Sequence, residues 1–332
     1  MASENNKKLL LIYVLEILKE HSDGDNPLTQ QEIIDKINLV YNMKVERKAI
    51  SSNIENLRSL GFDIQQINRK GYFLGQREFE PSEVQFLVDA VFSSRVISAK
   101  QSIDLSKKLY SFLSKYQRKK YNYIYKSESL LKSNNKQIFY NIELINEAIE
   151  KKKQISFTYN EYDINQNLVP RKNVKVYVVN PYFMVNSQGK YYLVCNYNAF
   201  DEIANYKMDL ITDIKILDRQ VKPVNKLKGY EKGLDVTKYV NQNIYMFGSE
   251  VITAEVELLN PNYTISILKE WFGKNATIKK ENNKTFATII SNEKALVYWC
   301  LQYGEHIKLL SPEQTKTQLQ KQIEILRKNY ID

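Results

Sequence analysis

The chain has 332 residues and a formal net charge of +10; 43% of its residues are hydrophobic and 26% are charged. This composition is typical of folded proteins, and the length predicts two to four domains. We expect no membrane contact, because no stretch approaches the roughly 18 apolar residues that a spanning helix needs. Cys195 and Cys300 lack metal-binding spacing, which indicates buried free thiols and hence a cytoplasmic protein.

Charge is unevenly distributed near the N-terminus. Residues 1–43 carry 4 basic and 7 acidic groups, whereas residues 44–76 carry 6 basic and 3 acidic groups. A net charge alone indicates only attraction to polyanions. A separate basic half, however, is typical of a domain that presents one face to phosphate groups.

The first two helices are predicted from their polarity and their ends. Lys7–Glu20 is apolar nearly all round, so we expect it at the centre of a core. Thr29-Gln30-Gln31-Glu32 is a capping box, in which the threonine hydroxyl and the glutamate each satisfy a backbone amide. Leu28 and Ile33 occupy the positions of a hydrophobic staple. The second helix is therefore expected to begin at Thr29.

A third helix is predicted over Glu46–Leu60, with Gly61 as its C-terminal stop. Ile50, Ile54 and Leu57 recur at helical spacing and so face the core. The opposite face carries small hydroxyls and an amide flanked by cations, which can approach base edges in the major groove. The DNA-contacting residues predicted on this helix are Arg47, Lys48, Ser51, Ser52, Asn56 and Arg58.

Two short strands, Ile64–Ile67 and Gly71–Leu74, complete a predicted domain of residues 1–76. Three helices with a basic-tipped hairpin predict a winged helix-turn-helix, in which the third helix enters the major groove of DNA. Arg69 and Lys70 at the hairpin tip are expected to contact phosphates. The alternative is a helical fragment that makes protein contacts.

Residues 77–140 are predicted to form a helical connector. Pro81 opens one helix, and Val84–Phe92 and Ser102–Tyr116 are amphipathic. The basic run Arg118-Lys119-Lys120 is interpreted as a solvated surface, with a nucleic-acid contact as the alternative.

Residues 141–222 change to a pattern that is typical of β-structure. A helix, Ile142–Lys152, precedes alternating β-branched and aromatic segments, which predict a small closed barrel. These segments are Ile155–Tyr159, Val174–Val179, Tyr182–Val185, Tyr191–Tyr197, Ile203–Lys207 and Ile214–Leu217.

The stretch Pro181–Val185, then Gly189–Val194, then Tyr206–Asp209 resembles the signature of the WYL domain, whose Trp-Tyr-Leu triplet reads Tyr-Tyr-Leu here. The resemblance implies a barrel of the Sm or SH3 type, placed between an N-terminal DNA-reading module and a C-terminal dimerising module. The hairpin strand Gly71–Leu74 is similar to the Gly-Tyr-apolar strand that closes the DNA-binding domain of WYL regulators.

The resemblance also implies that the barrel senses a nucleic-acid or nucleotide-like ligand. Tyrosines among lysines suit base stacking and phosphate pairing. The family's Arg-x-Asp-Arg pattern reads Lys207–Leu210 here, so one phosphate donor is replaced by leucine. The alternative is that the tyrosines pack the core of the barrel. Carried over from the family, the candidate ligand-binding residues are Tyr159, Lys175, Tyr192, Tyr206 and Lys207.

Residues 223–249 are predicted as a linker, and residues 250–332 as a ferredoxin-like βαββαβ domain with a final helix. The segment resembles the C-terminal extension of WYL regulators, known as WCX, which implies a homodimer. Ser311 is the predicted N-cap of the last helix. The predicted elements are Val251–Leu259, Tyr263–Phe272, Thr277–Lys280, Thr285–Ile290, Glu293–Leu301, Ile307–Leu310 and Pro312–Tyr330.

The order of these α+β domains predicts a homodimeric, sequence-specific transcriptional regulator that binds a double-stranded DNA operator. The alternative is an accessory protein whose WYL domain binds single-stranded RNA or DNA and assists a CRISPR-type effector. We expect no enzyme, cofactor or metal, because His21 and His306 lack partners at meaningful spacing and no phosphate-binding glycine loop is present.

Overall fold

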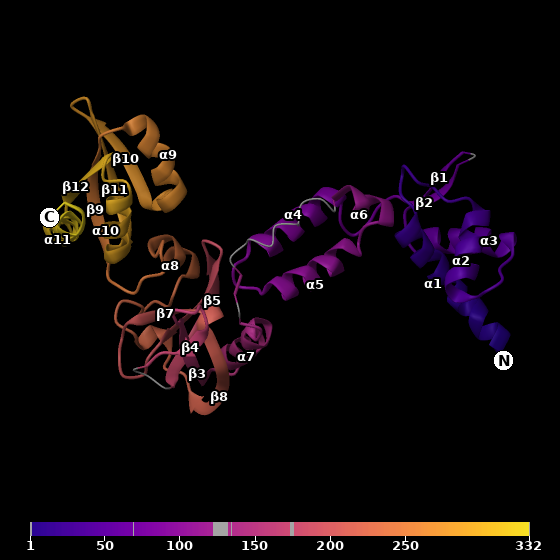
Figure 1. Ribbon diagram of the computed structural model, residues 1–332, viewed down its shortest axis with the longest axis horizontal. Coiled ribbons are helices and arrows are strands. Elements are labelled where there is room, and N and C mark those ends of the chain that lie inside the picture. Colours follow the sequence, from indigo (N-terminus) through magenta and orange to yellow (C-terminus); the bar gives the residue numbers. More distant parts are fainter. Residues whose placement is uncertain (1, 69, 122–131, 134, 173–175, 332) are drawn as a thin grey trace. The chain divides into compact units, whose positions relative to one another are not determined.

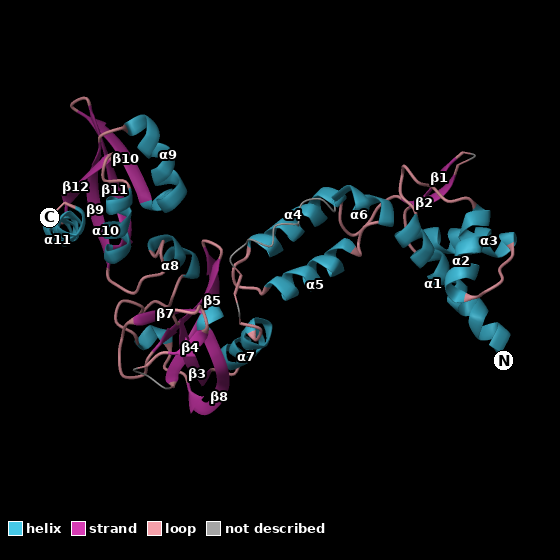
Figure 2. Ribbon diagram, in the orientation of Figure 1, coloured by secondary structure: helices cyan, strands magenta, loops and turns pink. Residues whose placement is uncertain are grey.

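The computed structural model divides into two compact units, Met1–Ser133 and Asn134–Asp332 (Figure 1). Both units contain helices and strands (Figure 2). The residues that the structure describes are 2–68, 70–121, 132–133, 135–172 and 176–331. Within them, no helix combines the length and the apolar character that crossing a membrane requires.

The first unit begins with three helices and a two-stranded hairpin, coloured indigo in Figure 1. The apolar stripe predicted on the third helix is buried against the first two helices. The hairpin strands have the predicted bounds. These elements are α1 (Ala2–His21), α2 (Gln30–Tyr41), α3 (Arg47–Ser59), β1 (Ile64–Ile67) and β2 (Gly71–Leu74).

The capping box is present at the start of α2. The amide of Glu32 donates to Thr29 Oγ1 over 3.2 Å, and the amide of Thr29 donates to Glu32 Oε2 over 2.8 Å. Leu28, just before the box, exchanges two backbone hydrogen bonds of 2.8 and 2.7 Å with Tyr72 of β2. Gly71 allows this approach, since a Cβ atom there would meet the Leu28 carbonyl carbon at 2.3 Å.

The rest of the first unit is helical, with α4 (Pro81–Ser93), α5 (Ala99–Tyr110) and α6 (Lys115–Tyr121). The helix predicted over Ser102–Tyr116 is therefore two helices. Ser114 causes the break, because its Oγ accepts a hydrogen bond from the Gln117 amide at the start of α6.

The connector is tied to the end of α1 by polar contacts. Ser114 Oγ donates to the buried Asp23 carboxylate over 2.6 Å. Arg118 pairs with Glu20, and Lys120 pairs with Asp25 at 3.0 Å. The interpretation of the basic run as a solvated surface holds for Lys120, which is exposed in its ion pair, whereas Arg118 is half-buried against Glu20.

The second unit opens with α7 (Ile138–Glu150), which contacts a curled antiparallel half-barrel sheet. The strands follow the order β4-β3-β5-β6-β7, and β8 also pairs with β3. The closed barrel predicted from the sequence is thus present as a half-barrel. Its strands are β3 (Lys153–Tyr162), β4 (Leu168–Pro170), β5 (Tyr177–Ser187), β6 (Lys190–Asn196), β7 (Ile203–Lys207) and β8 (Ile211–Gln220).

Two predicted strands form the single strand β5. Pro181 lies within it, where the register to β6 shifts between Pro181 and Phe183. This irregularity accommodates the proline, which cannot donate to a sheet ladder. A turn joins β5 to β6 through Gln188 and Gly189, both with positive φ.

The segment predicted as a linker packs on the half-barrel. It includes α8 (Val236–Gln242), and its Leu227, Tyr239 and Met246 join a core cluster with residues of β6 and β7. Tyr239 also donates from its hydroxyl to Asn205 Oδ1 over 3.0 Å. Widely spaced apolar residues in a polar stretch explain why the sequence pattern missed this packing.

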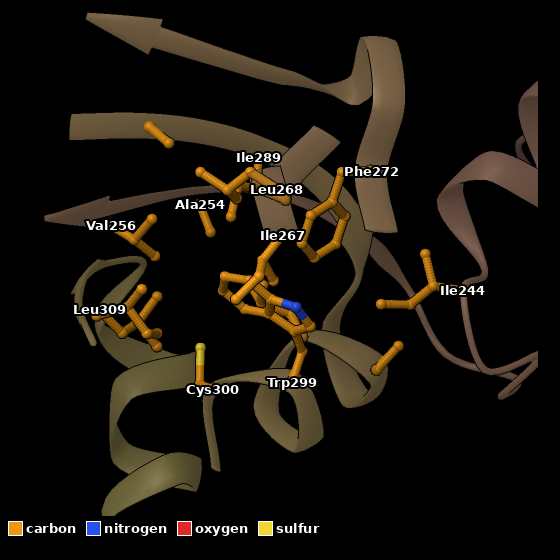
Figure 3. Packing of buried hydrophobic residues seen from close by; sticks show 14 of the residues in the cluster. Ile244, Ala254, Val256, Ile267, Leu268, Phe272, Ile289, Trp299, Cys300 and Leu309 are labelled. Atoms are coloured by element: carbon orange, nitrogen blue, oxygen red, sulfur yellow. The ribbon is translucent and has the colours of Figure 1, made fainter. Parts of the chain in front are cut away.

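The C-terminal region contains the predicted strands and helices in the predicted order. Its antiparallel sheet has the strand order β10-β11-β9-β12, and Trp299 and Phe272 pack edge to face in its core (Figure 3). The elements are β9 (Val251–Leu258), α9 (Pro261–Phe272), β10 (Ala276–Glu281), β11 (Lys284–Asn292), α10 (Glu293–Gln302), β12 (Ile307–Ser311) and α11 (Glu313–Tyr330).

The start of the last helix differs from the prediction. Ser311 was the expected N-cap, but it belongs to β12, and the cap position is Pro312. Ser311 pairs with Glu255 of β9 after a shift in register at the end of the strand. Sheet pairing thus extends one residue beyond the strand end that the sequence indicated.

Candidate functional site

The exposed face of α3 is the first candidate site. Ile50, Ile54 and Leu57 are almost fully buried on the opposite side of the helix. Because consecutive residues turn by about 100° around a helix, the polar residues between them project outward. The exposed predicted residues are Arg47, Lys48, Ser51, Ser52 and Asn56.

Arg58 differs from these residues because it is half-buried and bonded within the protein. Its Nε donates to the carbonyl oxygen of Ile64 over 2.9 Å, and its Nη1 pairs with Glu55 at 2.7 Å. The guanidinium also lies 5.9 Å from the centre of the Tyr72 ring. Arg58 therefore joins α3 to the hairpin, a role that the sequence pattern did not reveal.

Two further contacts define this surface. Ser51 Oγ accepts a hydrogen bond of 2.8 Å from Gln30 Nε2, which connects α3 to the first turn of α2. At the hairpin, Lys70 is exposed and its amide donates to the carbonyl of Ile67 over 3.0 Å. Arg69 lies outside the described residues. The described surface thus presents exposed cations on both α3 and the hairpin.

A tyrosine cluster in the half-barrel is the second candidate site. The Tyr159 and Tyr206 rings meet edge to face with centroids 4.8 Å apart, and Phe157 and Tyr177 complete the packing. Burial raises the pKa of Tyr159 to about 12 and also raises the pKa of Tyr206. Both phenols are consequently neutral hydrogen-bonding groups at physiological pH.

Strand register separates the predicted ligand residues into two sets. In the β6–β7 pair, Leu193 lies opposite Tyr206, whereas Tyr192 lies opposite Lys207. Opposed residues share a face and neighbours in sequence alternate, so Tyr206 and Lys207 face opposite ways. Tyr192 joins the core cluster of α8 instead of the tyrosine cluster. Lys175 lies outside the described residues.

Burial decides what these tyrosines can do. Tyr159 and Tyr192 are 7% and 6% exposed, so they pack the core, as the alternative interpretation held. Tyr206 and Lys207 are half-buried and keep accessible surface. Aromatic rings that stack on a base must expose a face, and the two buried tyrosines lack one.

Two residues that the sequence did not single out belong to the cluster. The Arg171 guanidinium lies 5.1 Å from the centre of the Tyr159 ring, and its Nε is 3.8 Å from Glu161. The Tyr197 and Tyr206 hydroxyls form a hydrogen bond. Arg171 supplies a cation beside the Tyr159 ring of the cluster. Residue spacing gave no signal for this, because β4 was not predicted.

Asp209, the acid of the signature, is partly buried beyond β7. Burial raises its pKa above the ordinary value, and the positive charges of Lys207 and Lys190 only partly offset that rise. Among the described residues, no group of three or more His, Cys, Asp or Glu is placed to hold a metal ion.

Comparison with protein families identifies this region. Residues 140–216 match the WYL domain. The chain contains a WYL domain. The match covers α7 and the half-barrel sheet through the first half of β8. No curated protein matches the chain.

Comparison with solved structures gives weak likenesses. The chain is similar to proteasome accessory factor B/C (PafBC) of Arthrobacter aurescens, with 14% identity, 97% of this chain and 49% of that chain covered, and a TM-score of 0.29. It is similar to a CRISPR Cas-related protein, with 16% identity, coverage of 96% and 84%, and a TM-score of 0.36. The chain spans about half the length of PafBC. Such scores establish no shared arrangement of whole chains.

Proposed function

We propose that the protein is a homodimeric transcriptional regulator that binds double-stranded DNA in a sequence-specific manner. In this proposal α1, α2, α3 and the hairpin form a winged helix-turn-helix. The observation that carries it is the exposed polar face of α3, where Lys48, Ser52 and Asn56 project opposite a fully buried apolar stripe. WYL domain content supports the proposal without deciding it.

The dimensions and chemistry of α3 suit the major groove. At about 1.5 Å per residue, a helix of 13 residues is about 20 Å long, and the groove is about 12 Å wide. Asn56 has the amide that reads adenine, and Lys48 has the cation that reads guanine. Lys70 on the hairpin would hold the phosphate backbone, which fixes position without reading sequence.

Dimerisation is assigned in this proposal to the C-terminal region, taken as a ferredoxin-like extension. Its last helix, α11, buries only Thr315 fully. Ile323, Leu326 and Tyr330 are 51%, 43% and 84% exposed on that helix. An exposed apolar surface of this kind supports a contact with a second copy.

A ligand at the WYL domain would regulate DNA binding in the proposed function. Tyr206 keeps accessible surface at the tyrosine cluster, where Arg171 adds a cation, whereas Lys207 keeps accessible surface on the opposite face of β7. A ligand can change DNA affinity only if it binds the competent and incompetent states unequally. The proposal therefore places the effector at a nucleic-acid or nucleotide-binding patch on this domain.

Selection of sites from a random duplex library with the full chain tests the DNA assignment. Lys48→Ala, Ser52→Ala and Asn56→Ala should each reduce preference for the selected site by about 1–3 kcal/mol. Lys70→Ala should weaken all duplexes alike and reduce the salt slope by about 1. Lys100→Ala on α5, an exposed lysine outside the three-helix region, is the matched control.

Unchanged sequence preference in all three α3 variants would refute the docking of α3. Selective binding of single strands over any duplex would favour the accessory-protein alternative, in which the WYL domain is the nucleic-acid contact. Sedimentation of the full chain with and without DNA measures the dimer. A monomer at every concentration would remove the two-fold arrangement from the proposal.

A further inference from the structure

A hollow of about 470 Å³ lies in the second unit, apart from the WYL signature residues. Its volume falls in the range of about 300–1,000 Å³ that small-molecule sites occupy. The wall comes from the starts of β3 and β5, the loop between β6 and β7, and the end of β8. The lining residues are Gln154, Val178, Tyr197, Asn198, Ala199, Phe200, Arg219 and Gln220.

A network of buried amides holds one side of this hollow in place. Gln154 Nε2 donates to Asn180 Oδ1 over 2.9 Å, and Asn180 Nδ2 donates to Asn196 Oδ1 over 3.1 Å. Asn196 Nδ2 in turn donates to the carbonyls of Phe200 and Glu202 over 2.8 and 2.9 Å. Asn180 and Asn196 are fully buried. The loop that lines the hollow is therefore fixed by side chains beneath it.

Lys222 adds a second attachment for the same loop. Its ammonium donates to the Phe200 carbonyl over 3.2 Å and pairs with Asp201 at 2.8 Å. Its backbone amide donates to Asn180 Oδ1 over 3.0 Å. A surface loop held by this many directed contacts has little conformational entropy left to lose on binding a ligand.

Three kinds of group line the hollow and remain available. Tyr197 and Phe200 meet edge to face with centroids 6.2 Å apart, and Phe200 is 60% exposed. Arg219 is exposed and makes no ion pair with any other described residue. Gln220 and Asn198 bring further amide groups to the rim. The hollow thus combines stacking surface, an uncompensated guanidinium and neutral hydrogen-bonding groups.

We propose that this hollow binds a small anionic molecule with a planar ring, of the nucleoside phosphate class. The guanidinium of Arg219 pairs with the phosphate, since its planar fork matches phosphate oxygens. The base stacks on the exposed ring of Phe200 and meets the Tyr197 ring edge to face, because the two rings are nearly perpendicular. The exposed amides of Asn198 and Gln220 satisfy the polar edges of the ligand.

The hollow is connected to the WYL signature through one hydrogen bond. Tyr197 lines the hollow, and its hydroxyl bonds to that of Tyr206 in the tyrosine cluster. The rings of Tyr206 and Tyr159 then meet within the cluster. A ligand that moves Tyr197 changes this contact, so binding in the hollow alters the surroundings of Tyr206, a residue of the WYL signature. The site itself does not depend on DNA binding by the first unit.

Titration calorimetry of the full chain with the four ribonucleoside monophosphates tests the proposal. Adenosine and inorganic phosphate serve as probes that carry only one half of the ligand. Arg219→Gln should raise the dissociation constant about tenfold to a hundredfold, and Phe200→Ala about fivefold to a hundredfold. Lys215→Gln removes the same charge from an exposed position of β8 and should change the constant less than about twofold.

Four results would overturn the assignment. One is no saturable binding of any monophosphate below about 1 mM. A second is an equal loss of affinity in Arg219→Gln and Lys215→Gln. A third is inorganic phosphate binding as tightly as the nucleotide. The last is loss of nucleotide binding in Lys207→Ala while Arg219→Gln still binds, which would place the ligand at the WYL signature residues. Duplex binding by the same samples reports separately on α3, so the two proposals fail independently.

Discussion

Helix α3 and the tyrosine cluster use polar side chains in opposite ways. On α3 the core is made by three aliphatic residues, and the polar groups project from the far side of the helix. In the cluster the phenol rings are themselves core, and Tyr159 is only 7% exposed. Substitution of the exposed residues of α3 should therefore change binding while stability is kept. Substitution in the cluster should change stability first.

The largest expected effect is at Tyr159 in the cluster. Tyr159→Ala removes a buried ring that packs against three others, and should destabilise the second unit by about 3–5 kcal/mol. Tyr159→Phe keeps the ring and loses only the acceptor of a 3.4 Å bond from the Lys207 amide, at a cost below about 1 kcal/mol. Urea unfolding measures both. A small loss in the alanine variant would show that the ring is not core.

Gly71 tests the hairpin beside α3. Gly71→Ala would place a Cβ atom 2.3 Å from the Leu28 carbonyl at a φ of +126°, and should cost about 3 kcal/mol. Gly61→Ala is the control, because its φ of +92° is strained but nothing lies within 4 Å, so about 1 kcal/mol is expected. Thermal unfolding compares the two. Equal losses would mean that the Leu28–Tyr72 bridge does not constrain Gly71.

Two residues of α3 are expected to differ in role: Arg58 stabilises the fold, and Lys48 contacts DNA. Arg58→Ala should lower stability by about 1–2 kcal/mol, because it leaves the Ile64 carbonyl and Glu55 without this partner. Lys48→Ala should alter stability by less than about 0.5 kcal/mol. Paired measurement of unfolding and of duplex preference decides between the roles. If Arg58→Ala changed duplex preference but not stability, Arg58 would belong to the predicted DNA-contact surface.

The smallest effect concerns Asp23, a polar group that is structural rather than exposed. Burial raises its pKa, but hydrogen bonds from Ser114 and Asn26 outweigh burial, so the pKa lies below its ordinary value. Ser114→Ala should cost about 1 kcal/mol at neutral pH. A depressed carboxyl pKa stabilises above the unfolded pKa of about 3.9, so the difference should shrink as pH falls below about 4. A pH-independent difference would exclude this carboxylate as the cause.

Local sequence signals determined the first three helices and much of the C-terminal order. The capping box at Thr29 and the stripe of Ile50, Ile54 and Leu57 act within four to seven residues, where helix geometry fixes which side chains meet. The bounds of the hairpin strands were predicted from equally local signals. Strand bounds in the C-terminal region were predicted within about two residues for the same reason.

Only the tertiary structure decided which residues of different strands share a surface. Alternation along β6 and β7 is visible in the sequence, but the register that places Tyr206 opposite Leu193 is not. Arg171, which follows β4, reaches Tyr159 of β3, and Arg219 at the end of β8 lines the hollow together with Phe200 from the loop between β6 and β7. Such contacts depend on how the half-barrel curls. Periodicity fixes the faces of each element, whereas pairing between distant elements fixes the sites.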